Sequence, residues 1–96
     1  RNVRLTAEQR MLAPNIFRIL KESRNFASTH TVEETIAYVT DSLNALPQME
    51  VEYYEIVDGS TMQPVRSWDA SSHIVGCITV YCGEVRLIDN IAYKAN

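Results

Sequence analysis

The spacing of apolar residues changes at Pro47, and this change most limits what the chain can fold into. Before Pro47, apolar residues recur every three or four positions, which is the spacing of one helix face. After Pro47, apolar and polar residues alternate in short runs, which is the spacing of strands. Helices followed by strands, rather than interleaved with them, predict an α+β fold and not a parallel α/β sheet.

Two helices are expected before Pro47. The first begins at Thr6, which with Gln9 fits a capping box, and ends near 26–28. Pro14 interrupts it and predicts either a kink, or a short turn over 7–13 followed by a helix with Pro14 in its first turn. The second helix begins at Thr31, with Glu34 completing another capping box, and stops at Pro47.

Three strands are expected after Pro47. The first covers 50–58, with Val51, Tyr53 and Val57 on one face and Tyr54 and Ile56 on the other. The segment 62–65 is at most an edge piece, and 66–73 is a loop. The segments 74–81 and 85–91 form a hairpin around Gly83 and Glu84. The first of these two is apolar throughout, so we expect it at the centre of the sheet with both faces covered, and we expect the tail 92–96 to be frayed.

The fold class that these elements predict is α+β, with two N-terminal helices packed on a small three-stranded, mainly antiparallel sheet that ends in a β-hairpin. At 96 residues the chain is expected to be one domain. Twelve acidic residues exceed nine basic ones, which argues against a nucleic-acid surface. No apolar run reaches the length of a membrane span. The two cysteines, five positions apart on one strand and on opposite faces, are expected to be reduced, because that separation is too long for a disulfide.

No catalytic constellation is visible in the residues themselves. His30 and His73 are expected to be solvated loop histidines, and three scattered glycines cannot form a phosphate loop. Glu50, Glu52 and Glu55 are interpreted as solvent-exposed side chains of a strand rather than as carboxylates that carry out acid–base catalysis. Arg1 and Arg4 precede a helix N-terminus, where an anion is favoured, although two arginines at a chain start are more often simply solvated.

Four runs, in this order, resemble the C-terminal domain of pantothenate synthetase (pantoate–β-alanine ligase). Arg1-Asn2 followed by Leu5-Thr6-Ala7-Glu8-Gln9-Arg10 is similar to the family's Ser-Ser-Arg-Asn linker and Leu-Ser/Thr-x-Glu-x-Arg helix start, cut after the two serines. The later runs are Val51–Asp58, Thr61–Val65 and Arg86-Leu87-Ile88-Asp89-Asn90-Ile91. Gly59, Cys77 and Cys82 depart from the family pattern, at positions that concern packing rather than chemistry.

The resemblance implies that residues 1–96 are the C-terminal lid domain of a larger two-domain ligase, whose N-terminal Rossmann-like catalytic domain is absent here. That enzyme condenses pantoate and β-alanine to pantothenate through a pantoyl adenylate, forming AMP, and serves coenzyme A biosynthesis. It uses ATP and Mg²⁺. By position, Arg1 would bind the ATP phosphates. No catalytic residue and no metal ligand is carried over to this chain.

The same resemblance implies a cytoplasmic enzyme that is a homodimer, with the domain's own N-terminal catalytic domain as its partner and pantoate and β-alanine as small-molecule substrates. The isolated domain is expected to bind no cofactor and to be inactive. An alternative stays open from the sequence alone, because capped helices and a hairpin also suit a free-standing α+β interaction or ligand-binding module.

Overall fold

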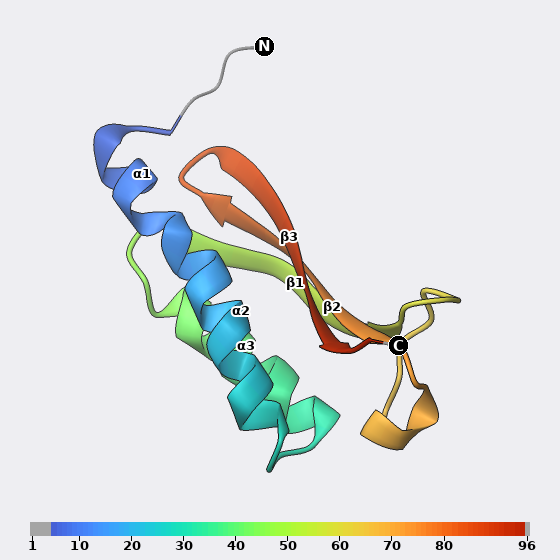
Figure 1. The fold of residues 1–96 in the computed structure, drawn as a ribbon. Coiled ribbons are helices and arrows are strands. Elements are labelled where there is room, and N and C mark those ends of the chain that lie inside the picture. The colour runs from blue at the N-terminus through green and yellow to red at the C-terminus, as the bar shows by residue number, and fades with distance from the viewer. Residues whose placement is uncertain (1–4, 96) are drawn as a thin grey trace.

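The structure, a computed structural model, describes residues 5–95 as two layers, one of helices and one a sheet (Figure 1). Both long helices lie on the same face of the sheet. The elements in chain order are α1 (Ala7–Leu12), α2 (Pro14–Ala27), α3 (Val32–Asn44), β1 (Met49–Asp58), a 3₁₀ turn (Trp68–Ala70), β2 (Ile74–Cys82) and β3 (Val85–Lys94). The predicted α+β architecture is confirmed.

Both predicted capping boxes are present. The Thr6 hydroxyl accepts the Gln9 backbone N–H at 3.1 Å, and the Gln9 side-chain oxygen accepts the Thr6 N–H at 3.0 Å. Thr31 and Glu34 make the same reciprocal pair at 3.0 and 2.9 Å. Each box satisfies two N–H groups that a helix start leaves without an intrahelical partner.

The chain breaks at Pro14 in the second of the two ways that the sequence predicted. α1 ends at Leu12 with the Ala13 N–H donating to the Gln9 carbonyl at 2.8 Å, and α2 starts with Pro14 as its first residue. The proline ring has no N–H to donate, and at a first helical position none is needed. α2 ends at Ala27, which lies within the range 26–28 predicted for the end of the first helix.

The three strands pair in the order β1-β2-β3, and both pairings are antiparallel. β2 is therefore the central strand, as predicted. The β2–β3 hairpin turns through Gly83 and Glu84, and Gly83 has a positive φ of 62° that suits glycine. The Val57–Pro64 bridge confirms that the segment 62–65 is only an edge piece.

A β-bulge in β1 overturns one predicted face assignment. Pairing steps from Val51 opposite Val80 to Tyr53 opposite Thr79, which leaves Glu52 as an extra residue. The extra residue reverses the alternation, so Val51 faces the helices together with Tyr54 rather than lying on the face of Tyr53. Simple alternation cannot anticipate this, because the period of two is broken at a single position.

The core lies between the sheet and α2 and α3. Apolar side chains from the predicted helix stripes meet the inward-facing residues of the strands there. The fully buried members are Leu20, Val39, Leu43, Ile74, Ile78, Val80 and Cys82. Because both helices cover one face only, the expectation that β2 is covered on both faces is wrong for residues 5–95. No helix in that range is long and apolar enough to cross a membrane.

The C-terminal tail is ordered further than predicted. β3 continues to Lys94, and the Tyr93 hydroxyl lies 2.7 Å from the Ser23 hydroxyl of α2 and also bonds to the Tyr54 hydroxyl of β1. The Lys94 ammonium donates to the Trp68 carbonyl at 2.6 Å. The prediction of a frayed tail from residue 92 is therefore wrong, because these side-chain bonds hold the strand end against α2 and the loop before β2.

Candidate functional site

The one predicted site residue, Arg1, lies outside the described residues, and so does Arg4. The structure describes the fold from Leu5 onward, the residue that leads into α1. The region around Leu5 is therefore the part of the candidate site that can be built from observed geometry.

Gln9 connects three separate segments beside the start of α1. Its side chain is 8% exposed, and its amide N–H donates to the Gln48 side-chain oxygen at 2.8 Å. Gln48 has a φ of 64°, and its backbone carbonyl accepts the Gly83 N–H at 2.9 Å. The start of α1, the turn before β1 and the hairpin turn are thus tied together. The sequence indicated the capping role of Gln9 but not this second role, which depends on residues 39 and more positions away.

A shallow groove of about 360 Å³ runs beside Leu5, between the α1–α2 junction and β3. The Arg10 guanidinium donates to the Leu5 carbonyl at 3.3 Å at this groove. The other lining residues are Ala13, Pro14, Ile16, Phe17, Leu87, Ile88 and Asp89. Two of the runs that carry the resemblance, 5–10 and 86–91, therefore meet here although they are far apart in the sequence.

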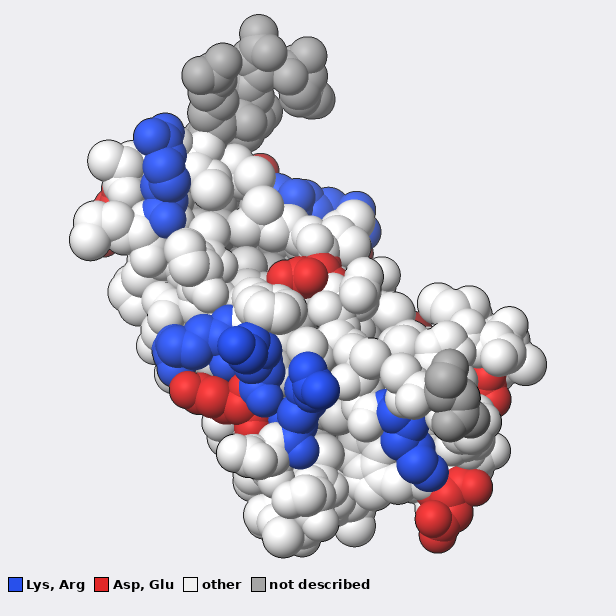
Figure 2. Space-filling model, in the orientation of Figure 1, with Lys and Arg blue, Asp and Glu red and all other residues white. Residues whose placement is uncertain are grey.

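Charge is distributed unevenly over the described surface. Lys and Arg side chains gather over α2 (Figure 2), where Arg18, Lys21 and Arg24 occur within one helix. α3 carries acidic residues without a basic one, and β1 does the same. The basic edge is therefore the α2 side of the molecule, and a nearby anion would be attracted to that side.

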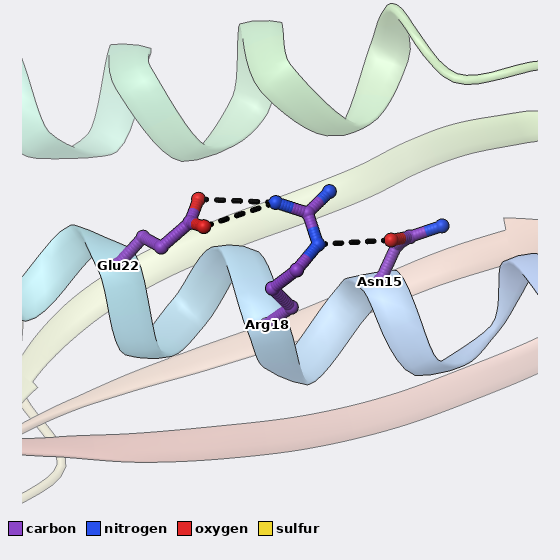
Figure 3. Close-up of polar contacts among 3 residues, drawn as sticks. All are labelled: Asn15, Arg18 and Glu22. Carbon is purple, nitrogen blue, oxygen red and sulfur yellow. Dashed lines mark hydrogen bonds and ion pairs between the residues drawn. The ribbon is translucent and has the colours of Figure 1, made fainter.

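Arg18 is already engaged by its own helix. Its guanidinium donates to the Asn15 side-chain oxygen at 2.9 Å and to both Glu22 carboxylate oxygens at 3.0 and 3.2 Å (Figure 3). Both charged side chains are about half exposed. An i,i+4 pair of this kind contributes only about 0.3–0.5 kcal/mol to stability. We therefore interpret these three residues as a solvated helix surface, not as an anion site.

The two histidines have structural contacts. The His30 ring stacks on Phe26 with centroids 3.6 Å apart, its Nδ1 lies 2.8 Å from the Phe26 carbonyl oxygen, and its own carbonyl accepts the Trp68 indole N–H at 2.8 Å. His30 is therefore half-buried rather than freely solvated, which corrects the prediction for that residue. His73 is half-buried as well, so the same correction applies to it, and its backbone N–H donates to the Ser71 hydroxyl at 3.1 Å.

The acidic residues of β1 lie on the exposed surface, as predicted. Glu52 accepts a bond from the Arg86 guanidinium of β3 at 3.0 Å, and this hydrogen bond raises the pKa of Arg86. Glu50 and Glu55 are exposed as well. Within residues 5–95, no group of three His, Cys, Asp or Glu side chains could hold a metal ion.

Cys77 and Cys82 are free thiols on opposite faces of β2, as expected. Burial raises the pKa of the Cys77 thiol, and the nearby Glu55 carboxylate raises it further. Burial likewise raises the pKa of the Cys82 thiol. Both are therefore held in the protonated, less nucleophilic form at neutral pH.

The buried hydroxyl cluster of Ser23, Tyr54 and Tyr93 joins α2 to the sheet. Burial, together with the neighbouring tyrosine, raises the pKa of the Tyr54 phenol far above its usual range, and burial raises that of Tyr93. Neither phenol therefore ionises near neutral pH. Tyr93 also lines a shallow groove with Arg24 and Trp68, but the hydroxyls of the cluster bond to one another, so we interpret the cluster as serving the fold.

The described residues thus form a two-layer α+β domain, with two long helices on one face of a three-stranded antiparallel sheet. The sequence profile of the Pantoate-beta-alanine ligase family matches residues 1–92, and the chain belongs to that family. The family resemblance predicted from the four runs is confirmed.

Similar proteins include the pantothenate synthetase of Porphyromonas gingivalis, which is 58% identical over 94 residues that make up 98% of this chain and 34% of that protein. The pantothenate synthetase of Bacteroides fragilis is 56% identical over 98% of this chain and 33% of its own length. A crystal structure of the enzyme from Thermus thermophilus has a TM-score of 0.82 at 29% identity, covering 95% of this chain and 33% of that one. The chain therefore spans about a third of the length of these relatives.

Proposed function

We propose that this chain is the C-terminal lid domain of an ATP-dependent pantoate–β-alanine ligase. The observation that carries the proposal is the family match over residues 1–92 together with relatives that are about three times as long. On this view the remaining two thirds form an N-terminal Rossmann-like catalytic domain, which holds the substrates. The whole enzyme is then a cytoplasmic homodimer.

The reaction proceeds in two balanced steps. The pantoate carboxylate attacks the α-phosphorus of ATP, which releases pyrophosphate and leaves pantoyl adenylate. The amine of β-alanine then attacks the acyl carbon, forms the amide bond of pantothenate and releases AMP. Mg²⁺ neutralises phosphate charge in such a step. We assign no residue of the range 5–95 to Mg²⁺, because no group of three His, Cys, Asp or Glu side chains in that range could hold a metal ion.

In this proposal the domain contributes a phosphate contact and a cover. The Arg1 guanidinium, four residues before the anchored Leu5, would stabilise negative charge on the phosphates. The cover would exclude water, because an acyl adenylate is readily hydrolysed. The Gln9 bonds at the start of α1 support this role, since they fix the place from which the preceding residues leave the fold.

The proposal is tested by Arg1→Ala in the longer enzyme, with Arg4→Ala as the matched control. Loss of one preorganised contact to a developing charge lowers kcat about 10²–10³-fold. We expect that loss for Arg1→Ala, with a circular dichroism spectrum and a Tm unchanged from the parent. Equal and small effects of both substitutions would contradict the phosphate role of Arg1.

A further inference from the structure

The central strand β2 carries no charge on the face of the sheet that points away from the helices. On β2 its residues are Val75, Cys77, Thr79 and Tyr81, and none of them carries a charge at neutral pH. An antiparallel sheet that faces water normally presents polar residues on its open side. On β2, the side chains of this outer face are therefore less polar than those of a sheet face exposed to solvent.

The neighbouring strands continue this pattern only opposite Thr79, because Tyr81 and Cys77 pair with Glu50 and Glu55 on β1. Thr79 pairs with Tyr53 on β1 and with Ile88 on β3, and these two side chains are 42% and 69% exposed. Thr79 itself is fully buried, and its hydroxyl has no hydrogen-bond partner among the described residues. The middle of the outer face is thus an uncharged row across all three strands, with apolar or aromatic side chains on either side of Thr79.

Charged groups lie around this row rather than in it. Glu52 and Arg86 form their 3.0 Å ion pair at the hairpin end of the sheet. Glu50 and Glu55 pair with Tyr81 and Cys77, in the rows on either side of the Thr79 row. Protein–protein interfaces usually have few charged residues at their centre and more polar residues at their rim, and this face has the same distribution. It is also what the sequence of β2 indicated, since a strand apolar throughout is typical of one covered on both faces.

We propose that the outer face of the sheet, centred on Tyr53, Thr79 and Ile88, is the docking surface for the part of the ligase that this chain does not include. This inference rests on the proposed function, and it commits to an intramolecular partner because the relatives extend over about three times the length of this chain. The partner surface has to be apolar at its centre, with room for the Ile88 side chain, and polar where it meets Glu52 and Arg86.

Cys77 provides a probe inside this face. Its thiol is half-buried, whereas Cys82, on the opposite face of the same strand, is fully buried. We would measure N-ethylmaleimide labelling of each cysteine by peptide mass spectrometry, in the 96-residue chain and in the longer enzyme. The Cys77 rate should fall about tenfold or more in the longer enzyme, which corresponds to docking favoured by about 1.4 kcal/mol. Cys82 should stay slow in both proteins.

A substitution in the longer enzyme tests the same surface. Ile88→Asp should restore fast labelling of Cys77, because a carboxylate in the apolar row opposes docking. Met11→Asp is the matched control, since Met11 is 80% exposed on α1 and does not belong to the outer face of the sheet, so it should leave labelling unchanged.

Three outcomes would overturn the inference. Cys77 labelled equally fast in both proteins would show that the face is open to solvent. Protection of Cys77 in the 96-residue chain that increases with its concentration would assign the face to a second copy. No response to Ile88→Asp would place the partner elsewhere. Pantothenate formation by the same longer protein is measured in parallel, so failure of the docking surface is separable from failure of the proposed function.

Discussion

The hydroxyl cluster that ties α2 to the sheet makes the most quantitative prediction, through Tyr93→Phe. The substitution removes one oxygen and little volume. Ser23 keeps its bond to the Leu20 carbonyl, but the Tyr54 hydroxyl, on a side chain only 6% exposed, loses its tyrosine partner. A buried hydroxyl left unsatisfied costs about 1–3 kcal/mol. At about 4–8 °C per kcal/mol for a domain of this size, Tm should fall by about 4–24 °C.

The assay is urea unfolding of the 96-residue chain, with the midpoint compared at constant m-value. Tyr53→Phe is the control, because Tyr53 is exposed and should change the unfolding free energy by no more than about 0.5 kcal/mol. Adding Tyr54→Phe to Tyr93→Phe should recover part of the loss, since it removes the orphaned hydroxyl. Equal stability of the Tyr93→Phe and Tyr53→Phe variants would refute the reasoning, because the tail of β3 would then not be anchored by its hydroxyl.

The remaining predictions concern the caps and alkaline pH. Thr31→Ala should lower the unfolding free energy by about 1 kcal/mol, while Thr31→Ser keeps the cap and should be nearly neutral in urea unfolding. Thr6→Ala should cost at least as much as Thr31→Ala, since Thr6 also holds Gln9; a smaller loss would argue against that bond. The raised pKa values of Tyr54 and Tyr93 favour the protonated phenols in the fold, so this stability is complete below pH 10 and is lost as the pH rises above it. Unfolding midpoints between pH 9 and about 11 should fall less in the Tyr54→Phe, Tyr93→Phe double variant than in the parent; parallel curves would contradict the assignment.

Features set by neighbouring residues could be predicted from the sequence. The caps at Thr6 and Thr31, the break at Pro14 and the hairpin at Gly83 each depend on residues within a few positions of one another. The central position of β2 could be predicted because β2 is the most apolar of the three strands, although the exact strand order was left open. Local hydrogen bonding and hydrophobic spacing are sufficient for such features.

Features set by distant residues could not be predicted in this way. The bulge at Glu52 changes the side on which Val51 lies, and only the pairing with β2 reveals it. Tyr93 is anchored by Ser23, 70 positions earlier, which no pattern in the last residues indicates. The predicted site residue, Arg1, came from the family resemblance, because two arginines near a helix start are not distinctive by themselves, and its role stays a prediction.

The central claim is that this chain does its work as one part of a longer ligase. The most direct test is pantothenate formation from pantoate, β-alanine, ATP and Mg²⁺, measured by mass spectrometry for the 96-residue chain and for the longer protein. The account predicts product, with one AMP released for each pantothenate, from the longer protein and none from the chain alone. Turnover by the 96-residue chain alone, or none by a folded longer protein, would contradict it.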